Sequence, residues 1–177
     1  MNIADVIENL KKRNFKEALS GIEKILINNP NFEQNINLKG VILANLNRVI
    51  EARKCWLDAL KINNLYFDSI YNLGDSYLNN KEYDEALKYF KKALELQPKN
   101  FIIHFKIGYL FMQKQKLDEA LLFFNQSKDL NNKFPNTFFN MGIVLNLLNK
   151  KKESILLFES YTKLQPNDVE AQYSLGI

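Results

Sequence analysis

The stretch over residues 67–100 reads FDSIYNLGDSYLNNKEYDEALKYFKKALELQPKN and contains the pattern from which the chain is built. Its landmarks are Gly74, Ala86, Phe90 and Pro98. Steps of 34 residues from Gly74 in both directions reach Gly40, Gly108, Gly142 and Gly176. Five of the six glycines therefore share one register, which is the signature of a repeat protein.

Each period contains two runs of apolar residues at three- and four-residue spacing, separated by a short turn, which predicts two antiparallel helices. In the first repeat, Pro30 is expected to stop the second helix, because proline cannot continue it. Ala18 lies 34 residues before Ala52, so the register holds although Val6 takes the glycine position. The pattern predicts one domain over residues 1–177, with repeats at about 1–32, 33–66, 67–100, 101–134 and 135–168 and a partial repeat at 169–177.

The spacing has a physical reason. A single repeat cannot bury its own apolar face, so successive repeats are expected to stack. We expect the glycine of the first helix to meet the alanine of the second where the two helices cross. The aromatic residue four positions after the alanine is expected to fill the space beside that contact.

The turn inside each repeat favours a residue with a left-handed backbone. Asn47 and Asn149 adopt that conformation readily, whereas other side chains do so at a cost. We therefore expect the turns at Arg13, Lys81 and Gln115 to be strained or to use another geometry.

These residues resemble the tetratricopeptide repeat (TPR) family, whose pattern is W-x2-L-G-x2-Y, A-x3-F and P over one period. The matching residues are Leu73, Gly74, Tyr77, Ala86, Phe90 and Pro98. The resemblance implies an all-α fold, a right-handed α-solenoid of antiparallel helix pairs. It also implies a non-catalytic scaffold or adaptor that binds a peptide or partner segment in a concave groove.

In that family the first helices line the groove, and the fifth position of each repeat faces it. Here this position holds Asn37, Tyr71, Phe105, Phe139 and Tyr173. The sixth and ninth positions add Asn72, Lys106, Asn140, Asp75, Tyr109 and Ile143. These residues are the candidate peptide-binding groove, with aromatic rings for apolar contact and amides for the peptide backbone. The same rings can instead serve mainly to pack the helices, and the sequence leaves both interpretations open.

Two branches of the family supply alternatives. One branch clamps the C-terminal carboxylates of chaperones, and only Asn72 and Lys106 match its residues in kind. Another carries an asparagine ladder at the sixth position before a glycosyltransferase domain, and Asn72 and Asn140 match it in part. A recruitment arm of a larger enzyme such as a glycosyltransferase, or a self-assembling module, is therefore the alternative function.

No set of residues points to catalysis, so we predict no enzyme activity, no cofactor and no metal. A zinc site needs three or four ligands, and the chain has one histidine, His104, and one cysteine, Cys55. We predict that His104 is a packed core residue and that Cys55 is a half-buried structural thiol. The chain also lacks a glycine-rich phosphate loop.

Composition predicts the remaining partners and the location. The net charge of +4 comes from scattered lysines, so no nucleic-acid partner is expected, and the lysine runs at Lys11 and Lys150 are interpreted as solvated turns. No apolar run is long enough for a membrane span, and the start does not read as a signal peptide. One cysteine fits a reducing, cytoplasmic setting. Tyr173 and Ile177 predict an exposed apolar surface at the end of the chain. Because such a surface needs to be covered, we expect either a longer chain or a homo-oligomer that forms through the terminal helices.

Overall fold

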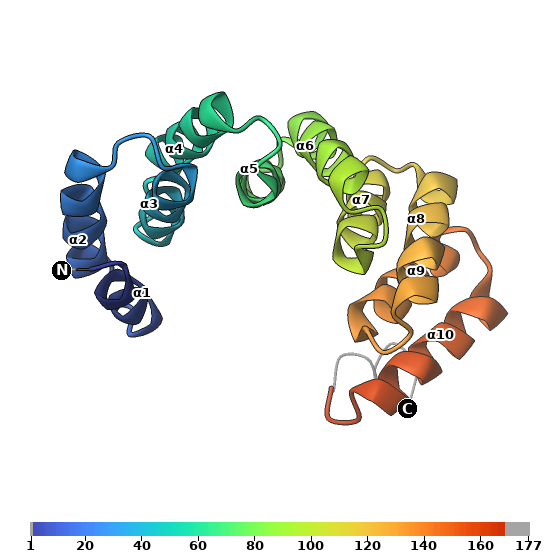
Figure 1. The fold of residues 1–177 in the computed structure, drawn as a ribbon. Helices are drawn as coiled ribbons and strands as arrows, with labels where there is room; N and C mark the ends of the chain where they lie inside the picture. The colour runs from blue at the N-terminus through green and yellow to red at the C-terminus, as the bar shows by residue number, and fades with distance from the viewer. Residues whose placement is uncertain (1, 169–177) are drawn as a thin grey trace. The chain divides into compact units, whose positions relative to one another are not determined.

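The computed structural model describes residues 2–168, and every regular element in that range is an α-helix. The helices form two compact units that divide after Leu96. Unit 1 contains α1 (Ile3–Lys11), α2 (Phe15–Asn28), α3 (Glu33–Asn45), α4 (Val49–Ile62), α5 (Phe67–Asn79) and α6 (Tyr83–Leu96). Unit 2 contains α7 (Phe101–Gln113), α8 (Leu117–Leu130), α9 (Pro135–Leu147) and α10 (Lys151–Leu164). Within each unit the helices run in antiparallel pairs (Figure 1).

The helix boundaries follow the 34-residue step. Repeats two to five were predicted to begin at residues 33, 67, 101 and 135, and α3, α5, α7 and α9 begin at those residues. Each of these first helices has 13 residues, and α2, α4, α6, α8 and α10 each have 14. The second helices of repeats two and four reach this length with Asn64 and Asn132 where other repeats have proline, so proline is not what limits the helix.

The glycine register marks a close contact between the two helices of a repeat. A methyl group added at Gly40 would lie 2.4 Å from the indole nitrogen of Trp56. The same addition at Gly108 would lie 2.7 Å from a ring carbon of Phe124, and Gly74 and Gly142 meet their repeats' rings at 2.9 and 2.8 Å. The aromatic ring therefore occupies the space that a side chain at the glycine position would take. The alanines Ala52, Ala86 and Ala120 are fully buried beside it.

The first repeat shows why it tolerates a larger residue at the glycine position. Its second helix carries Ile22 where the other repeats carry an aromatic ring. Val6 and Ile22 are both fully buried in one cluster with Ala18 and Ile42. A branched aliphatic pair therefore replaces the glycine–ring pair while keeping the core filled.

The turns inside the repeats all share one geometry. The residues at Arg13, Asn47, Lys81, Gln115 and Asn149 have φ between 59° and 61°. In the second repeat, Asn47 N–H donates to the Ala44 carbonyl and Arg48 N–H donates to the Leu43 carbonyl. This pair of bonds is the Schellman ending of a helix, which requires a left-handed residue. The turns at Arg13, Lys81 and Gln115 are therefore strained, as predicted, and none of them uses another geometry.

The loops between repeats add aromatic contacts in unit 2. Phe134 stands just before α9, and its ring lies 5.2 Å from Phe101 and 5.1 Å from Phe105, measured between ring centres. Phe32 holds the same place before α3, but the preceding first helix begins at Ile3, one turn later in the repeat. Phe32 stays 47% exposed.

Candidate functional site

The aromatic residues at the fifth repeat position combine packing with partial exposure. Tyr71, Phe105 and Phe139 are each half-buried. Each ring meets the buried ring of its own repeat, at centre distances of 5.8, 5.6 and 5.7 Å to Phe90, Phe124 and Phe158. The rings therefore help to pack the helix pairs and still offer apolar surface, which combines the two interpretations that the sequence left open.

Asn37 occupies the same position in repeat two but has another environment. It is buried, with 8% of its surface exposed. Its side-chain oxygen accepts hydrogen bonds from the Ser69 hydroxyl at 3.1 Å and from the Asn72 amide at 3.0 Å. Its backbone oxygen accepts one from the Trp56 indole at 3.2 Å. Asn37 thus joins α3, α4 and α5 instead of presenting its side chain to the surface.

A cavity of about 350 Å³ lies beside this network in unit 1. Two of the candidate groove residues, Asn72 and Asp75, line it. The other lining residues come from the ends of α3 and α5, from the turn that follows α3 and from α4, and they are Val41, Ala44, Asn45, Asn47, Val49, Trp56, Ser76, Asn79 and Asn80. We call this cavity the asparagine pocket, because five of its lining residues are asparagines.

In unit 2 the corresponding surface is apolar. The candidate residues here are Phe105, Lys106, Tyr109, Phe139, Asn140 and Ile143, and we call them the ladder face of unit 2. All six are half-buried. Tyr109 and Phe105 pack beside the buried cluster of Phe124 and Met141. The Asn140 amide nitrogen donates to the Asn136 carbonyl at 2.8 Å, so part of its donor capacity is used within α9. Tyr173 lies outside the described residues.

Arg53 on α4 fastens the second repeat to the third, a role that the sequence reasoning missed. Its guanidinium donates to the Ser76 hydroxyl and to the Ser76 carbonyl, both at 2.9 Å, and pairs with Glu82 at 2.8 Å. It also lies 4.0 Å from the ring centre of Tyr77. Arginine side chains are mostly exposed, so no sequence signal marks this one as a contact between repeats. The recurrence of Asn45 and Asn79 one period apart was a visible signal for the pocket.

Burial and one carboxylate govern the electrostatics near the pocket. Burial, and then the charge of Asp75, raise the pKa of Tyr71 to about 12. The phenol therefore stays neutral at physiological pH. Burial also raises the pKa of the Cys55 thiol, and the residue is half-buried, as predicted. A raised pKa lowers the thiolate fraction, so Cys55 is a weak nucleophile.

His104 is buried, as predicted. Its Nε2 donates to the Pro98 carbonyl at 2.8 Å, and its Nδ1 lies 3.1 Å from the Gln126 side chain. It therefore ties the start of α7 to α8 and to the preceding loop. Across residues 2–168 no three histidine, cysteine, aspartate or glutamate side chains come together in a group that could hold a metal.

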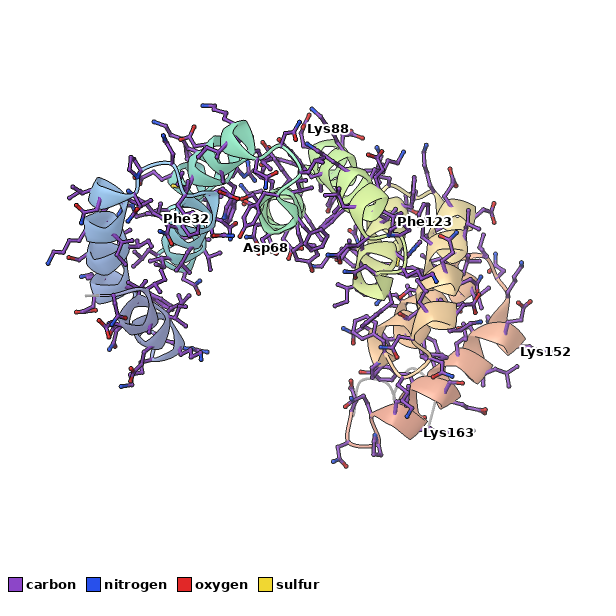
Figure 2. All side chains as sticks on the ribbon, in the orientation of Figure 1. Phe32, Asp68, Lys88, Phe123, Lys152 and Lys163 are labelled. Carbon is purple, nitrogen blue, oxygen red and sulfur yellow. The ribbon has the colours of Figure 1, made fainter. Side chains whose placement is uncertain are left out.

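The outer surface supplies two further observations. No helix among the described residues is long and apolar enough to cross a lipid bilayer. Lys150, Lys151 and Lys152, at the start of α10, are all exposed, as a solvated turn requires. Figure 2 shows Lys152 on the outside of this helix.

Helical hairpins that repeat at a fixed step, four of which bury a glycine against a ring, are typical of an α-solenoid. The family model of the tetratricopeptide repeat matches residues 67–100, and a second tetratricopeptide repeat model matches residues 102–134. The chain is therefore a tetratricopeptide repeat protein, which confirms the resemblance and the all-α solenoid fold.

Solved structures with the same fold cover nearly the whole chain. MamA from Desulfovibrio magneticus RS-1, from residue 41 to its end, has a TM-score of 0.86 at 18% identity, over 94% of each chain. Another crystal structure of MamA has a TM-score of 0.84 at 16% identity, over 94% of this chain and 96% of that one. YrrB, described as a TPR protein with an unusual peptide-binding site, has a TM-score of 0.81 at 19% identity, over 99% of this chain and 90% of its own. No protein of curated function matches the sequence.

Proposed function

We propose that this protein is a non-catalytic interaction scaffold that binds a peptide or an extended segment of a partner protein. The proposed binding surface is the ladder face of unit 2, on the first helices α7 and α9. The fold supports this, and a peptide-binding site is described for YrrB, which shares the fold.

The observation that carries the proposal is the composition of α7 and α9. Lys106 is the one charged residue of the two helices together. A surface helix normally carries polar residues on the side that faces away from the core. Here Tyr109 and Ile143 are half-buried, and Leu147, at the end of α9 beside the exposed Asn146, is 53% exposed, so apolar surface is added to the polar residues of this side. Apolar side chains gathered on an uncovered surface are typical of a site for another molecule.

A peptide-display selection on the immobilised protein tests the proposal. Selected peptides are then titrated against the intact protein and against Ile143→Ser and Tyr109→Ser variants. We expect each variant to weaken binding about tenfold, since a lost apolar contact of this size is worth roughly 1–2 kcal/mol. Far-UV circular dichroism checks that each variant is folded.

Leu156→Ser is the matched control, because Leu156 is 61% exposed on α10 and lies outside the ladder face. Affinities that fall as much in this control as in the Ile143 variant would show that the selected peptides bind any apolar spot. Unchanged affinities in both ladder-face variants would remove the proposed surface.

Self-association is the second candidate, and it has an observation of its own. Ile3 and Ile7 on α1 are each 40% exposed, at the fifth and ninth repeat positions. Light scattering over a hundredfold concentration range decides it, and a constant monomer mass removes the candidate. A recruitment role beside a catalytic domain, a cytoplasmic location and the lack of a nucleic-acid partner stay predictions from the sequence.

A further inference from the structure

We propose that the asparagine pocket of unit 1 binds a neutral side-chain amide, that of a glutamine or an asparagine in the partner segment. This inference rests on the proposed function, because it takes the ligand to be a peptide, and it adds a separate subsite on unit 1. The walls of the pocket, the partners of its polar groups and the charges beside it all favour such a ligand.

The pocket has the size and the walls of a subsite for one side chain. Its volume of about 350 Å³ lies at the small end of ligand pockets, which span about 300–1,000 Å³. Val41, Val49 and Trp56 contribute apolar groups, along which the methylene groups of a side chain can lie. The asparagines and Ser76 contribute polar groups to the same pocket, so an amphipathic side chain matches its lining.

The protein itself orients the amide groups of two lining residues. Asn72 donates one side-chain N–H to the side-chain oxygen of Asn37 at 3.0 Å, and Asn45 donates one to the Val41 carbonyl at 2.9 Å. A side-chain amide has two N–H donors and one oxygen acceptor. Each of the two amide groups therefore keeps a second N–H donor and its oxygen acceptor for a ligand.

The remaining polar residues of the pocket also supply both kinds of hydrogen-bonding group. The Ser76 hydroxyl accepts a hydrogen bond from the Arg53 guanidinium at 2.9 Å and keeps its own O–H as a donor. Asn47, Asn79 and Asn80 are exposed lining residues and add further amide groups. A ligand that pairs with this lining needs a donor and an acceptor close together, and a side-chain amide has both on one carbon atom.

The charges beside the pocket have both signs, so they select neither a cation nor an anion. Asp75 is a lining residue, and the guanidinium of Arg53 donates to the hydroxyl and to the carbonyl of Ser76. A lysine side chain has no acceptor and an ionised glutamate has no donor, so each would leave part of the amide groups unpaired. An apolar side chain would leave all of them unpaired, and unpaired polar groups that lose water weaken binding.

The pocket contains its own reporter, because Trp56 is the single tryptophan of the chain. The probes are blocked tripeptides, Ala-X-Ala, in which X is glutamine, asparagine, glutamate, lysine or norleucine. Each is titrated into ¹⁵N-labelled full-length protein, and the indole resonance of Trp56 and the side-chain amide resonances of Asn72 are followed. We expect saturable shifts with an amide probe, and the affinities for glutamine and asparagine show which length fits. The other probes should bind about tenfold more weakly, which corresponds to the loss of one or two hydrogen bonds.

Two variants and a matched control make the test specific. Asn45→Leu and Asn79→Leu each remove one amide group of the pocket, and leucine has a similar size. Both residues are exposed and end their helices, so the fold should be kept, and circular dichroism checks this. Each variant should reduce the preference for the amide probe over norleucine about threefold, by the loss of one hydrogen bond. Asn28→Leu is the control, since Asn28 is exposed, ends α2 and does not line the pocket.

Three outcomes would overturn the inference. They are amide probes that bind no better than norleucine or glutamate, an unchanged preference in both pocket variants, or an equal loss in Asn28→Leu. Equal binding of every probe would mean that the pocket takes the peptide backbone instead of a side chain.

The result is separate from the test of the proposed function. Selected peptides that depend on Ile143 while the amide probes leave Trp56 and Asn72 unshifted would reject this subsite alone. Amide probes that shift these resonances while no selected peptide depends on the ladder face would reject the ladder face alone.

Discussion

Polar side chains add to the apolar contacts between neighbouring repeats in unit 1, and aromatic rings do so in unit 2. Between α3 and α5, Asn37 accepts hydrogen bonds from Ser69 and Asn72, and Arg53 reaches across to Ser76. Between α7 and α9, Phe105 meets Phe134, and Met141 joins the cluster of Phe124. The helix lengths and the glycine–ring contact are the same in both units, so one scaffold carries two kinds of interface.

The third repeat position shows how the difference arises. Ser69 and Thr137 are equivalent and both fully buried. Ser69 bonds to Asn37 on the preceding first helix, whereas Thr137 lies 3.1 Å from the hydroxyl of Ser127 on the preceding second helix. A hydroxyl at this position therefore takes whichever polar partner the neighbouring repeat supplies.

The largest effect is expected when the ring of a glycine–ring pair is removed. Trp56→Ala in unit 1 and Phe124→Ala in unit 2 should each lower the free energy of unfolding by about 3–5 kcal/mol, because a large buried cavity is left. Trp56→Ala should be the more costly, since Asn37 also loses the indole hydrogen bond. Urea unfolding followed by circular dichroism measures the loss, and amide hydrogen exchange assigns it to a unit.

Phe32→Ala is the control for these ring deletions, because Phe32 is 47% exposed and should lose about 1–2 kcal/mol at most. A loss in Phe124→Ala no larger than in this control would mean that the ring does not fill the space beside Gly108.

The next effect distinguishes the two interfaces directly. Asn37→Ala should cost about 2–3 kcal/mol, because Ser69 and Asn72 both lose their acceptor inside unit 1. Ser127→Ala in unit 2 should cost only about 1 kcal/mol, since alanine already stands at the equivalent positions 59 and 93. Equal losses in the two variants, measured by urea unfolding, would break the distinction between a polar and an apolar interface.

A smaller effect is expected at the glycines. Gly40→Ala and Gly142→Ala should destabilise by about 1–2 kcal/mol, which is the cost of overpacking less the gain in helix propensity. Gly40→Ala should be the worse of the two, because its added methyl would lie 2.4 Å from the ring of Trp56, compared with 2.8 Å at Phe158. The first repeat has Val6 at the glycine position and no aromatic ring opposite it. Val6→Gly makes the opposite change there and should also lower the stability of the protein. A higher free energy of unfolding in Gly40→Ala would contradict the close contact between Gly40 and the ring of Trp56.

The smallest effect concerns the left-handed turns, and it should be the same in both units. Lys81→Gly in unit 1 and Gln115→Gly in unit 2 should stabilise by up to about 1 kcal/mol, since glycine adopts φ near 60° without steric cost. Asn47→Gly and Asn149→Gly serve as controls and should change stability less, because asparagine tolerates this conformation. Thermal unfolding compares the midpoints of the four variants. A lower midpoint in Lys81→Gly would count against backbone strain at residue 81.

Much of the fold follows from the sequence, because the period is a property of local residue spacing. Gly74, Ala86 and Phe90 recur at fixed offsets, and each offset corresponds to a contact inside one helix pair. Such contacts depend on residues about 16 positions apart, so one repeat predicts the next. The left-handed turn at Lys81 was visible in the same way, since the helix ending requires it whatever residue stands there.

The chemistry of the surfaces was decided by contacts between repeats. The sequence placed Asn37 in the groove with Tyr71 because they are one period apart. The structure buries Asn37 because Ser69 and Asn72 of the next repeat reach it, and a buried amide must have its hydrogen bonds made. The asparagine pocket likewise needs α3, α4, α5 and the turn after α3 to meet. The sequence by itself thus determined the repeat and its helices, and the tertiary structure decided which of the repeated side chains remain available to a partner.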